Sequence, residues 1–503
     1  MQDILTKEQS KNETKEITIT SLRSMFVDMV KYSPSKLCGL IGNAMVIPIY
    51  TSLLSTEQYG IYTLAISFLS FLCIIFSDWI GLSALRFFRE HEIKEEMPKY
   101  LTTILLLLAT NLLVMFLLSP LYMYNSHFYK LFSIPPKLIL CILVLVVPVA
   151  IRALFFQILR AQIKPNAFTI STVLNQILTI AFSVLLMKFL KLGAYSVLIA
   201  MGISIIITDF LLFYQSNITK YIRYFKESKP KPELYSALFK YGIPLSVTSI
   251  SLWGINQSNR FIMMHLNGVK DVGLVGVSYN VTFSILMTFF AIITLAAVPR
   301  IINLYEEKVD VRPIISKLTE YYILISLPII VLYCIYSKEI IILLANEKFI
   351  NAHIIVPYLS FSVFFLALTD YTTLQYNLSK KTYINTTIKV ISAIIGLVLN
   401  FVLIKKYGLL GLGIATLGGN ILYFLLSITI VVPNLNWQVP YKKILHILTC
   451  FIPAGLIYWF IFKQLEFKPL AEMVALIFIY YATYISSQKL IEKTHSINSA
   501  KIN

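Results

Sequence analysis

The sequence predicts an all-α, polytopic membrane protein. Apolar stretches of membrane-spanning length follow one another from Met25 to Ser486, about 14 in all, where a hydrocarbon core needs roughly 20 apolar residues in a helix. Hydrophobic residues make up 57% of the 503 residues and charged residues 14%, with a mean hydropathy of +0.75, which excludes an ordinary soluble domain. No convincing strand pattern interrupts the apolar stretches.

The net charge of +18 is explained by Lys and Arg in cytoplasmic loops rather than by nucleic-acid binding. If the N-terminus is inside and each span reverses the chain, most basic residues fall in the loops of one side. This alternation predicts a multi-pass protein with an even number of spans and both termini cytoplasmic. The first twenty residues are polar, so no signal peptide is expected.

No catalytic or metal-binding pattern stands out. The five cysteines lie inside apolar spans without the spacing of metal ligands, and buried thiols are the simplest interpretation. The histidines are scattered, and no Gly-rich phosphate loop follows a strand. We therefore expect no metal, no cofactor and no enzymatic activity.

The chain contains two similar halves. Lys31–Pro34 enters the first span as Lys240–Pro244 enters the seventh, and Tyr59-Gly60 matches Val272-Gly273. Six spans separate the copies, so they are parallel repeats, and transporters built in this way place their substrate path between the halves. The predicted organisation is a cytoplasmic tail at 1–23, a six-helix lobe at 24–214, a basic cytoplasmic linker at 215–237, a second six-helix lobe at 238–432, two extra helices at 433–488 and a tail at 489–503.

Polar residues form a stripe on the first and seventh spans. A charge inside a span costs about 2.5–3.5 kcal/mol on insertion scales, so each needs a reason. Two stripes at equivalent positions are what a central polar cavity requires, although hydrogen bonding between helices is the alternative for the uncharged members. The predicted substrate-binding residues are Tyr32, Lys36, Asn43, Trp253, Asn256, Gln257 and Arg260.

Further charges lie nearer the ends of spans. The secondary cationic candidates are Lys31, Arg86, Arg152, Arg300 and Lys389. For Lys31, Arg152 and Lys389, snorkelling of the side chain to the interface is the alternative. Asp78 and Asp370 are candidates for coupling transport to H+ or Na+, although Asp78 can instead pair with Arg86. Because the deep charges are mainly basic, an anionic substrate is favoured.

These motifs resemble the polysaccharide transporter branch, or Wzx-type flippases, of the multidrug/oligosaccharidyl-lipid/polysaccharide (MOP) superfamily. The residues that carry the resemblance are Ser35-Lys36, Pro48, Leu53–Tyr62, Asp78–Leu82, Leu85-Arg86, Lys240–Pro244, Pro299-Arg300 and Tyr407–Thr416. The family often has Asp before the arginine that ends the seventh helix, where this chain has Asn259, so Arg260 lacks a neighbouring carboxylate. Val275 stands where the family tends to have Tyr.

The resemblance implies a flippase of the bacterial plasma membrane for undecaprenyl-diphosphate-linked oligosaccharides, used for O-antigen, capsule or exopolysaccharide. Its partners would be the lipid-linked oligosaccharide, membrane lipids and other polysaccharide-assembly proteins, with no nucleic acid. A MATE-like multidrug or cation exporter of the same fold is one alternative, and it would favour deep carboxylates. A membrane-embedded polysaccharide polymerase or glycosyltransferase is another, although the outer loops are short and lack a carboxylate pair. A scaffold without transport would not need the doubled polar stripe.

Overall fold

The computed structural model describes residues 39–42, 44–124, 134–216, 218, 220, 230–433, 435, 437, 440–462 and 469–500. Throughout these ranges the regular secondary structure is helical, without a strand, which confirms the all-α fold. Ten helices within them are long and apolar enough to cross a membrane. One of the ten, α17 (Thr382–Thr429), is two helices joined at Gly408. Further crossings come from the shorter apolar helix Gly39–Leu53 and from the helices before and after residue 268. The total agrees with the prediction of about 14 crossings.

In the first half, α2 (Thr56–Cys73), the π-helical η1 (Ile74–Asp78) and α3 (Trp79–Ile93) form one continuous helix, followed by α4 (Met97–Tyr124), α6 (Pro136–Ala161), α7 (Pro165–Phe189) and α8 (Ala194–Gln215). The second half contains α10 (Pro232–Asn256), α11 (Asn259–Leu266), α12 (Val269–Ser278), the π-helical η2 (Tyr279–Ser284), α13 (Ile285–Glu306), α14 (Arg312–Ile335), α15 (Ser337–Leu344), the 3-10 helix η3 (Glu347–Ile355), α16 (Val356–Leu378) and α17. The last elements are α18 (Tyr441–Thr449), α19 (Phe451–Ile457), the π-helical η4 (Tyr458–Phe462) and α20 (Pro469–Ala500).

The two halves follow the same path. The continuous helices Thr56–Ile93 and α12–η2–α13 each contain a π-helical segment. The turns that follow repeat the same rare positive φ at pairs of matching positions: Glu95 (55°) and Lys308 (63°), Ile163 (55°) and Lys380 (58°), Gly193 (58°) and Gly408 (57°). Such φ values are uncommon outside glycine, so the two matching pairs of non-glycine residues are strong evidence for the internal repeat.

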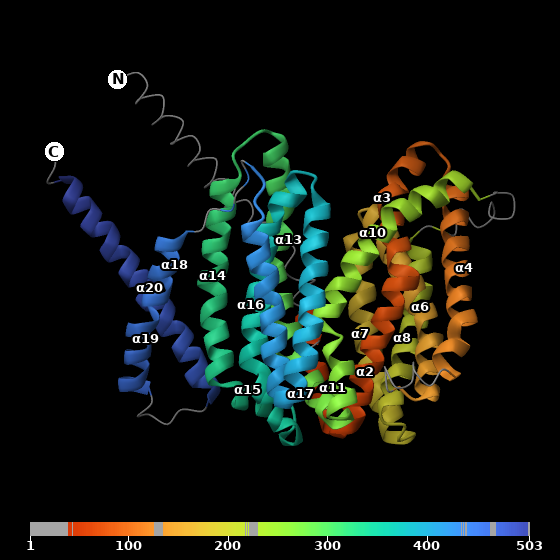
Figure 1. Cartoon of the computed structure of the whole chain (residues 1–503), viewed down its shortest axis with the longest axis horizontal. Coiled ribbons are helices and arrows are strands. Elements are labelled where there is room, and N and C mark those ends of the chain that lie inside the picture. Colours follow the sequence, from red (N-terminus) through yellow and green to blue (C-terminus); the bar gives the residue numbers. More distant parts are fainter. Residues whose placement is uncertain are drawn as a thin grey trace.

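The helices assemble into two bundles (Figure 1). One buried apolar cluster joins α2, α3, α4, α6 and α8 and extends to α10, α11 and α12. A second joins α13, α14, α16, part of α17 and the last helices. The helices α18 to α20 pack on the outside of the second bundle, beside α14 (Figure 1). There Trp437 donates its indole N–H to Thr319 Oγ1 at 3.1 Å, and Tyr480 is fully buried.

The helix α10 contacts both bundles. Its first half lies on α3, where Ser83 Oγ donates to the Leu238 carbonyl at 3.2 Å and Gly242 packs against Trp79. Its second half lies on α17, with the Thr248 and Thr386 hydroxyls 2.9 Å apart. In Figure 1 this helix crosses obliquely from the end of α3 towards α11.

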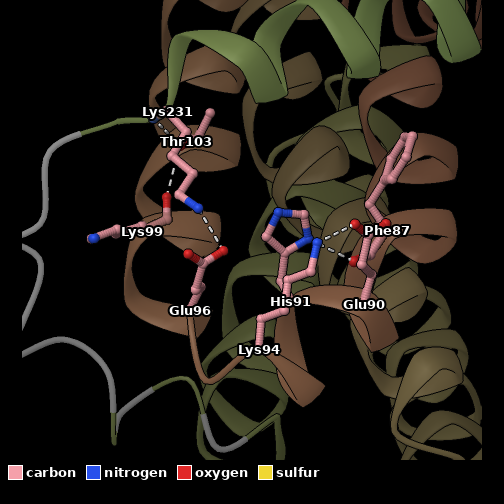
Figure 2. A network of polar contacts seen from close by, with 8 residues as sticks. All are labelled: Phe87, Glu90, His91, Lys94, Glu96, Lys99, Thr103 and Lys231. Atoms are coloured by element: carbon pink, nitrogen blue, oxygen red, sulfur yellow. Dashed lines mark hydrogen bonds and ion pairs between the residues drawn. The ribbon is translucent and has the colours of Figure 1, made fainter.

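A polar network fastens the beginning of α10 to the first bundle (Figure 2). The backbone N–H of Lys231 donates to Thr103 Oγ1 at 3.1 Å, and its ammonium lies 2.5 Å from the Glu96 carboxylate. The hydrogen bond from Lys231 holds the pKa of Glu96 below its ordinary value of 4.5. His91 stacks on Tyr100 beside this pair, with ring centroids 4.7 Å apart.

Candidate functional site

The two halves of the chain meet backbone to backbone along α2 and α12. A Cβ atom added to Gly60 would lie 2.1 Å from the Val269 carbonyl oxygen, and one added to Gly273 would lie 2.0 Å from the Thr56 carbonyl oxygen. Glycine is therefore required at both positions for this close approach. Gly60 and Gly273 are the pair that the repeat matches, so the contact lies at equivalent points of the two halves. We call this contact between α2 and α12 the lobe seam.

Beside the lobe seam the seventh span is broken. The helix α10 ends at Asn256, Gln257 and Ser258 form a turn, and α11 begins at Asn259. Non-helical backbone at membrane depth is tolerated only where it is buried in protein or lines a polar cavity, and broken helices of this kind often carry transporter binding sites.

Arg260 lies directly after this break and is 6% exposed. Its Nη1 donates to the Asn256 carbonyl at 3.3 Å and to Gln257 Oε1, and its guanidinium carbon lies 4.5 Å from the centre of the Tyr279 ring. Its Nε has no hydrogen-bond partner, and no carboxylate pairs with it within the described ranges. The cation is thus compensated by neutral dipoles and a π face alone, which leaves it suited to an anion.

Asn259 is the uncharged residue at the position before Arg260, where the family often has Asp. Its Nδ2 donates to the Tyr279 hydroxyl at 2.7 Å and to Thr416 Oγ1 at 3.2 Å. The amide therefore ties α11 to η2 and α17 without adding a negative charge beside Arg260. The expectation from the sequence that Arg260 lacks a neighbouring carboxylate agrees with this arrangement.

The other polar residues of the seventh span lie at the same place. Trp253 Nε1 donates to the Ser67 carbonyl at 3.0 Å, and Ser67 Oγ donates to Gln257 Oε1 at 3.2 Å, so both residues contact α2 of the first bundle. Asn256 Nδ2 donates within its own helix to the Leu252 carbonyl, and its Oδ1 has no partner. The structure therefore brings Trp253, Asn256, Gln257 and Arg260 together.

The first-span half of the predicted cavity cannot be placed. Tyr32, Lys36 and Asn43 lie outside the described residues, as does the secondary candidate Lys31. Tyr50, a polar residue farther along the first span, is buried, and its hydroxyl lies 2.9 Å from Ser183 Oγ of α7.

Arg152 lies away from the lobe seam. It is 8% exposed inside the first bundle and donates to Thr208 Oγ1 and to the Ser171 carbonyl at 3.2 and 3.3 Å. The snorkelling interpretation of Arg152 is therefore wrong, because its guanidinium is enclosed by α6, α7 and α8. Asp209, close by on α8, is also buried.

The remaining predicted charges are spread over the molecule. Arg86 is exposed, with its guanidinium 5.9 Å from the Phe87 ring, and Arg300 is half-buried on α13. Asp78 accepts a hydrogen bond from Ser77 at 3.4 Å and forms no ion pair with Arg86, so the predicted pairing is wrong.

Asp370 is the exception on its helix. It is exposed, whereas most of α16 around it is buried. Lys389 of α17 is half-buried, with its ammonium 5.8 Å from the Tyr423 ring, and attracts Asp370 electrostatically. This pair lies in the second bundle and is separate from Arg260.

Sequence reasoning missed the tyrosines around Arg260. Tyr279 of η2 lies under its guanidinium, and Tyr59 of α2 interacts with it electrostatically. Asn280 of η2 in turn donates its Nδ2 to the Tyr59 hydroxyl at 2.7 Å across the lobe seam. The match of Tyr59-Gly60 with Val272-Gly273 already singled out this region, but the sequence does not show that the two copies touch.

Comparison with known proteins identifies related chains. Residues 35–305, more than half of the chain, match the family model described as "Polysaccharide biosynthesis protein". Residues 244–402 match the MatE family model. A search of curated proteins gives no match.

Solved structures share the fold. "Lipid II flippase MurJ, inward closed conformation" is 16% identical over 93% of this chain and 99% of that one, with a TM-score of 0.71. An inward-facing multidrug resistance MATE family transporter of the MOP superfamily is 13% identical over 78% and 92% of the two chains, with a TM-score of 0.61. The outward-facing conformation of such a transporter is 15% identical over 82% and 94%, with a TM-score of 0.52.

Proposed function

Because this chain belongs to the polysaccharide biosynthesis protein family, within the MOP superfamily of transporters and flippases, we propose that it moves an undecaprenyl-diphosphate-linked oligosaccharide across the bacterial plasma membrane. The translocated unit then serves the synthesis of a surface polysaccharide such as O-antigen or capsule. In this proposal both termini are cytoplasmic and the substrate moves from the inner to the outer leaflet.

The observation that carries the proposal is Arg260, a buried guanidinium beside a broken helix that pairs with no carboxylate of the described residues. A diphosphate cannot cross hydrocarbon unaided at a useful rate, because it would lose its hydration. Arg260 offers a phosphate charge-assisted hydrogen bonds in a planar geometry, and the Asn256 backbone carbonyl and the Gln257 amide lie next to it. The polyprenyl tail remains in lipid while the head group passes between the lobes.

A cation exporter is the alternative from the same fold, and the exposed Asp370 favours it. An exporter of cationic compounds needs an accessible carboxylate, and Asp370 offers one, although Lys389 lies nearby. In the proposed function Asp370 and Asp78 instead remain candidates for coupling to H+ or Na+. The proposal includes no enzymatic step and no cofactor.

The test is a deletion of the gene. We expect loss of surface polysaccharide, accumulation of the lipid-linked unit on the cytoplasmic side and unchanged tolerance to cationic drugs. Normal surface polysaccharide with increased sensitivity to cationic drugs would contradict the proposal and support the exporter. A plasmid copy of the parent gene is the control and should restore the polysaccharide.

A further inference from the structure

Gln257 occupies a special place between Arg260 and the first bundle. Its Oε1 accepts a hydrogen bond from Arg260 Nη1, on the second-lobe side, and from Ser67 Oγ of α2 at 3.2 Å. A single amide oxygen is therefore shared by the buried cation and by the opposite lobe. Since Gln257 lies in the turn between α10 and α11, its backbone is not held in a continuous helix.

The hydrogen bond from Arg260 to Gln257 is one that an anion displaces. The donor Arg260 is charged in both cases, but the amide is a neutral acceptor, whereas a phosphate oxygen is charged and adds the attraction of opposite charges to the hydrogen bond. In the part of the chain that the structure describes, Arg260 has no carboxylate to resist such an exchange, and its Nε has no hydrogen-bond partner. Gln257 is half-buried and Arg260 is almost fully buried, so an incoming anion meets the amide first.

The hydrogen bond from Ser67 to Gln257 can be exchanged for another. The Ser67 hydroxyl also lies 2.9 Å from the Thr63 carbonyl of its own helix, so it has a second acceptor when Gln257 moves. Thr63 in turn lies against Gly276 at the lobe seam, where an added Cβ would approach Thr63 Oγ1 to 2.2 Å. The link thus runs from Arg260 through Gln257 and Ser67 to the contact between α2 and α12.

We infer that Gln257 is a positioning residue that couples capture of the substrate's diphosphate by Arg260 to release of the lobe seam. When a phosphate binds Arg260, Gln257 loses its charged donor and turns away. Ser67 then donates to the Thr63 carbonyl alone, so the two lobes lose the hydrogen bond between Ser67 and Gln257. The hydrogen bond from Trp253 to the Ser67 carbonyl involves no charged group, so phosphate binding leaves it in place and it keeps the lobes in register. This inference rests on the proposed function and adds to it a means of sensing the anionic head group.

The experiment measures lobe separation and binding in the same protein. Spin labels on cysteines at Ser52 and Lys348 report the separation, because both are exposed and the Lys348 ammonium lies 3.4 Å from the Ser52 carbonyl across the lobes. The full-length protein in lipid nanodiscs is titrated with farnesyl diphosphate, and with farnesol as the uncharged comparison. Dipolar broadening of the spin spectrum gives the separation, and calorimetry gives the affinity.

In the parent protein we expect farnesyl diphosphate, but not farnesol, to reduce the broadening. Gln257→Leu should lose the change in broadening. Ser67→Ala, which leaves Gln257 and Arg260 intact, should lose the change in broadening at unchanged affinity. Gln215→Leu is the matched control: Gln215 accepts from Ser171 at 3.4 Å, a similar pair within one bundle, and this variant should behave as the parent. If Gln257→Leu does not fold, Ser67→Ala decides.

Three results would overturn the inference while leaving the proposed function in place. The first is a separation that persists in Gln257→Leu or in Ser67→Ala. The second is a loss of affinity in Gln257→Leu as large as in Arg260→Ala, which would make Gln257 a direct ligand. The third is binding to the parent without any separation. A parent that binds no diphosphate would overturn the proposed function, and the inference with it.

Discussion

At the scale of single residues, the decisive feature is a buried cation, Arg260, without a counter-ion among the described residues. Arg260 was predicted from its place in the polar stripe and from Asn259 at the position before it. Its burial, its stacking on Tyr279 and its bond to Gln257 could not be predicted, because these partners come from other helices and from a break that contains neither Pro nor Gly.

Arg260→Ala should remain inserted and stable but bind a diphosphate lipid about 10- to 100-fold more weakly, since hydrogen bonds to charged groups contribute roughly 1.5–3 kcal/mol. Arg260→Lys should retain part of the binding, because an ammonium keeps the charge but loses the planar pair of donors. Binding to purified protein measures both. Arg160→Ala, at an exposed arginine, is the control, and normal binding by Arg260→Ala would place the anion site elsewhere.

A second residue-scale prediction concerns the Glu96–Lys231 pair (Figure 2). Because the pKa of Glu96 is lowered in the folded protein, the stabilisation is complete above its ordinary pKa of 4.5 and is lost as the pH falls through the lowered value. Glu96→Gln should therefore lower the thermal midpoint slightly at pH 7 and not at about pH 3. Thermal unfolding at both pH values measures this. Glu95→Gln is the control, and an equal effect of Glu96→Gln at both pH values would contradict the assignment.

At the scale of elements, the lobe seam depends on glycines from two helices. The repeat predicted that Gly60 and Gly273 are equivalent, since both precede a long apolar run. That they lie against each other is a tertiary fact, because a sequence repeat states equivalence and not contact. The same limit applies to α10, whose sequence places it in the second lobe although its first half packs on α3.

Gly273→Ala should push α2 and α12 apart, because the added Cβ would meet a backbone oxygen at 2.0 Å that has no rotamer to change. We expect a cost of about 1–3 kcal/mol, the usual range for overpacking. Gly455→Ala is the control, since nothing lies within 4 Å of its added Cβ, and it should be neutral or slightly stabilising. Thermal stability and the broadening between labels at Ser52 and Lys348 report the effect. A Gly273→Ala variant as stable and as closed as the parent would rule out a tight seam.

At the scale of the whole molecule, composition and apolar stretches were sufficient to predict the all-α membrane fold, because bilayer thickness restricts what such runs can form. The internal repeat could also be predicted from the sequence, and the matching positive-φ turns at Gly193 and Gly408 support it. The arrangement of the bundles around α10 (Figure 1) could not be predicted from the sequence, because helix packing depends on side-chain shape rather than on hydropathy.

Orientation in the membrane is a whole-molecule prediction from the basic loops. A single cysteine at Lys229, in a background without other cysteines, should resist impermeant thiol reagents in whole cells. A cysteine at Asn267 should react, and permeabilised cells provide the control for reactivity. The reverse pattern would invert the topology and, with it, the direction of entry to Arg260.

The most direct test of the central claim is flipping by the purified protein. Proteoliposomes containing the chain and a fluorescent undecaprenyl-diphosphate-linked oligosaccharide are treated with an impermeant quencher, which reports the fraction of lipid on each leaflet. The account predicts that the parent protein equilibrates the lipid between leaflets, that Arg260→Ala does so much more slowly, and that the parent does not move the cation tetraphenylphosphonium. Equal flipping by the parent and by empty liposomes, together with uptake of tetraphenylphosphonium, would contradict it.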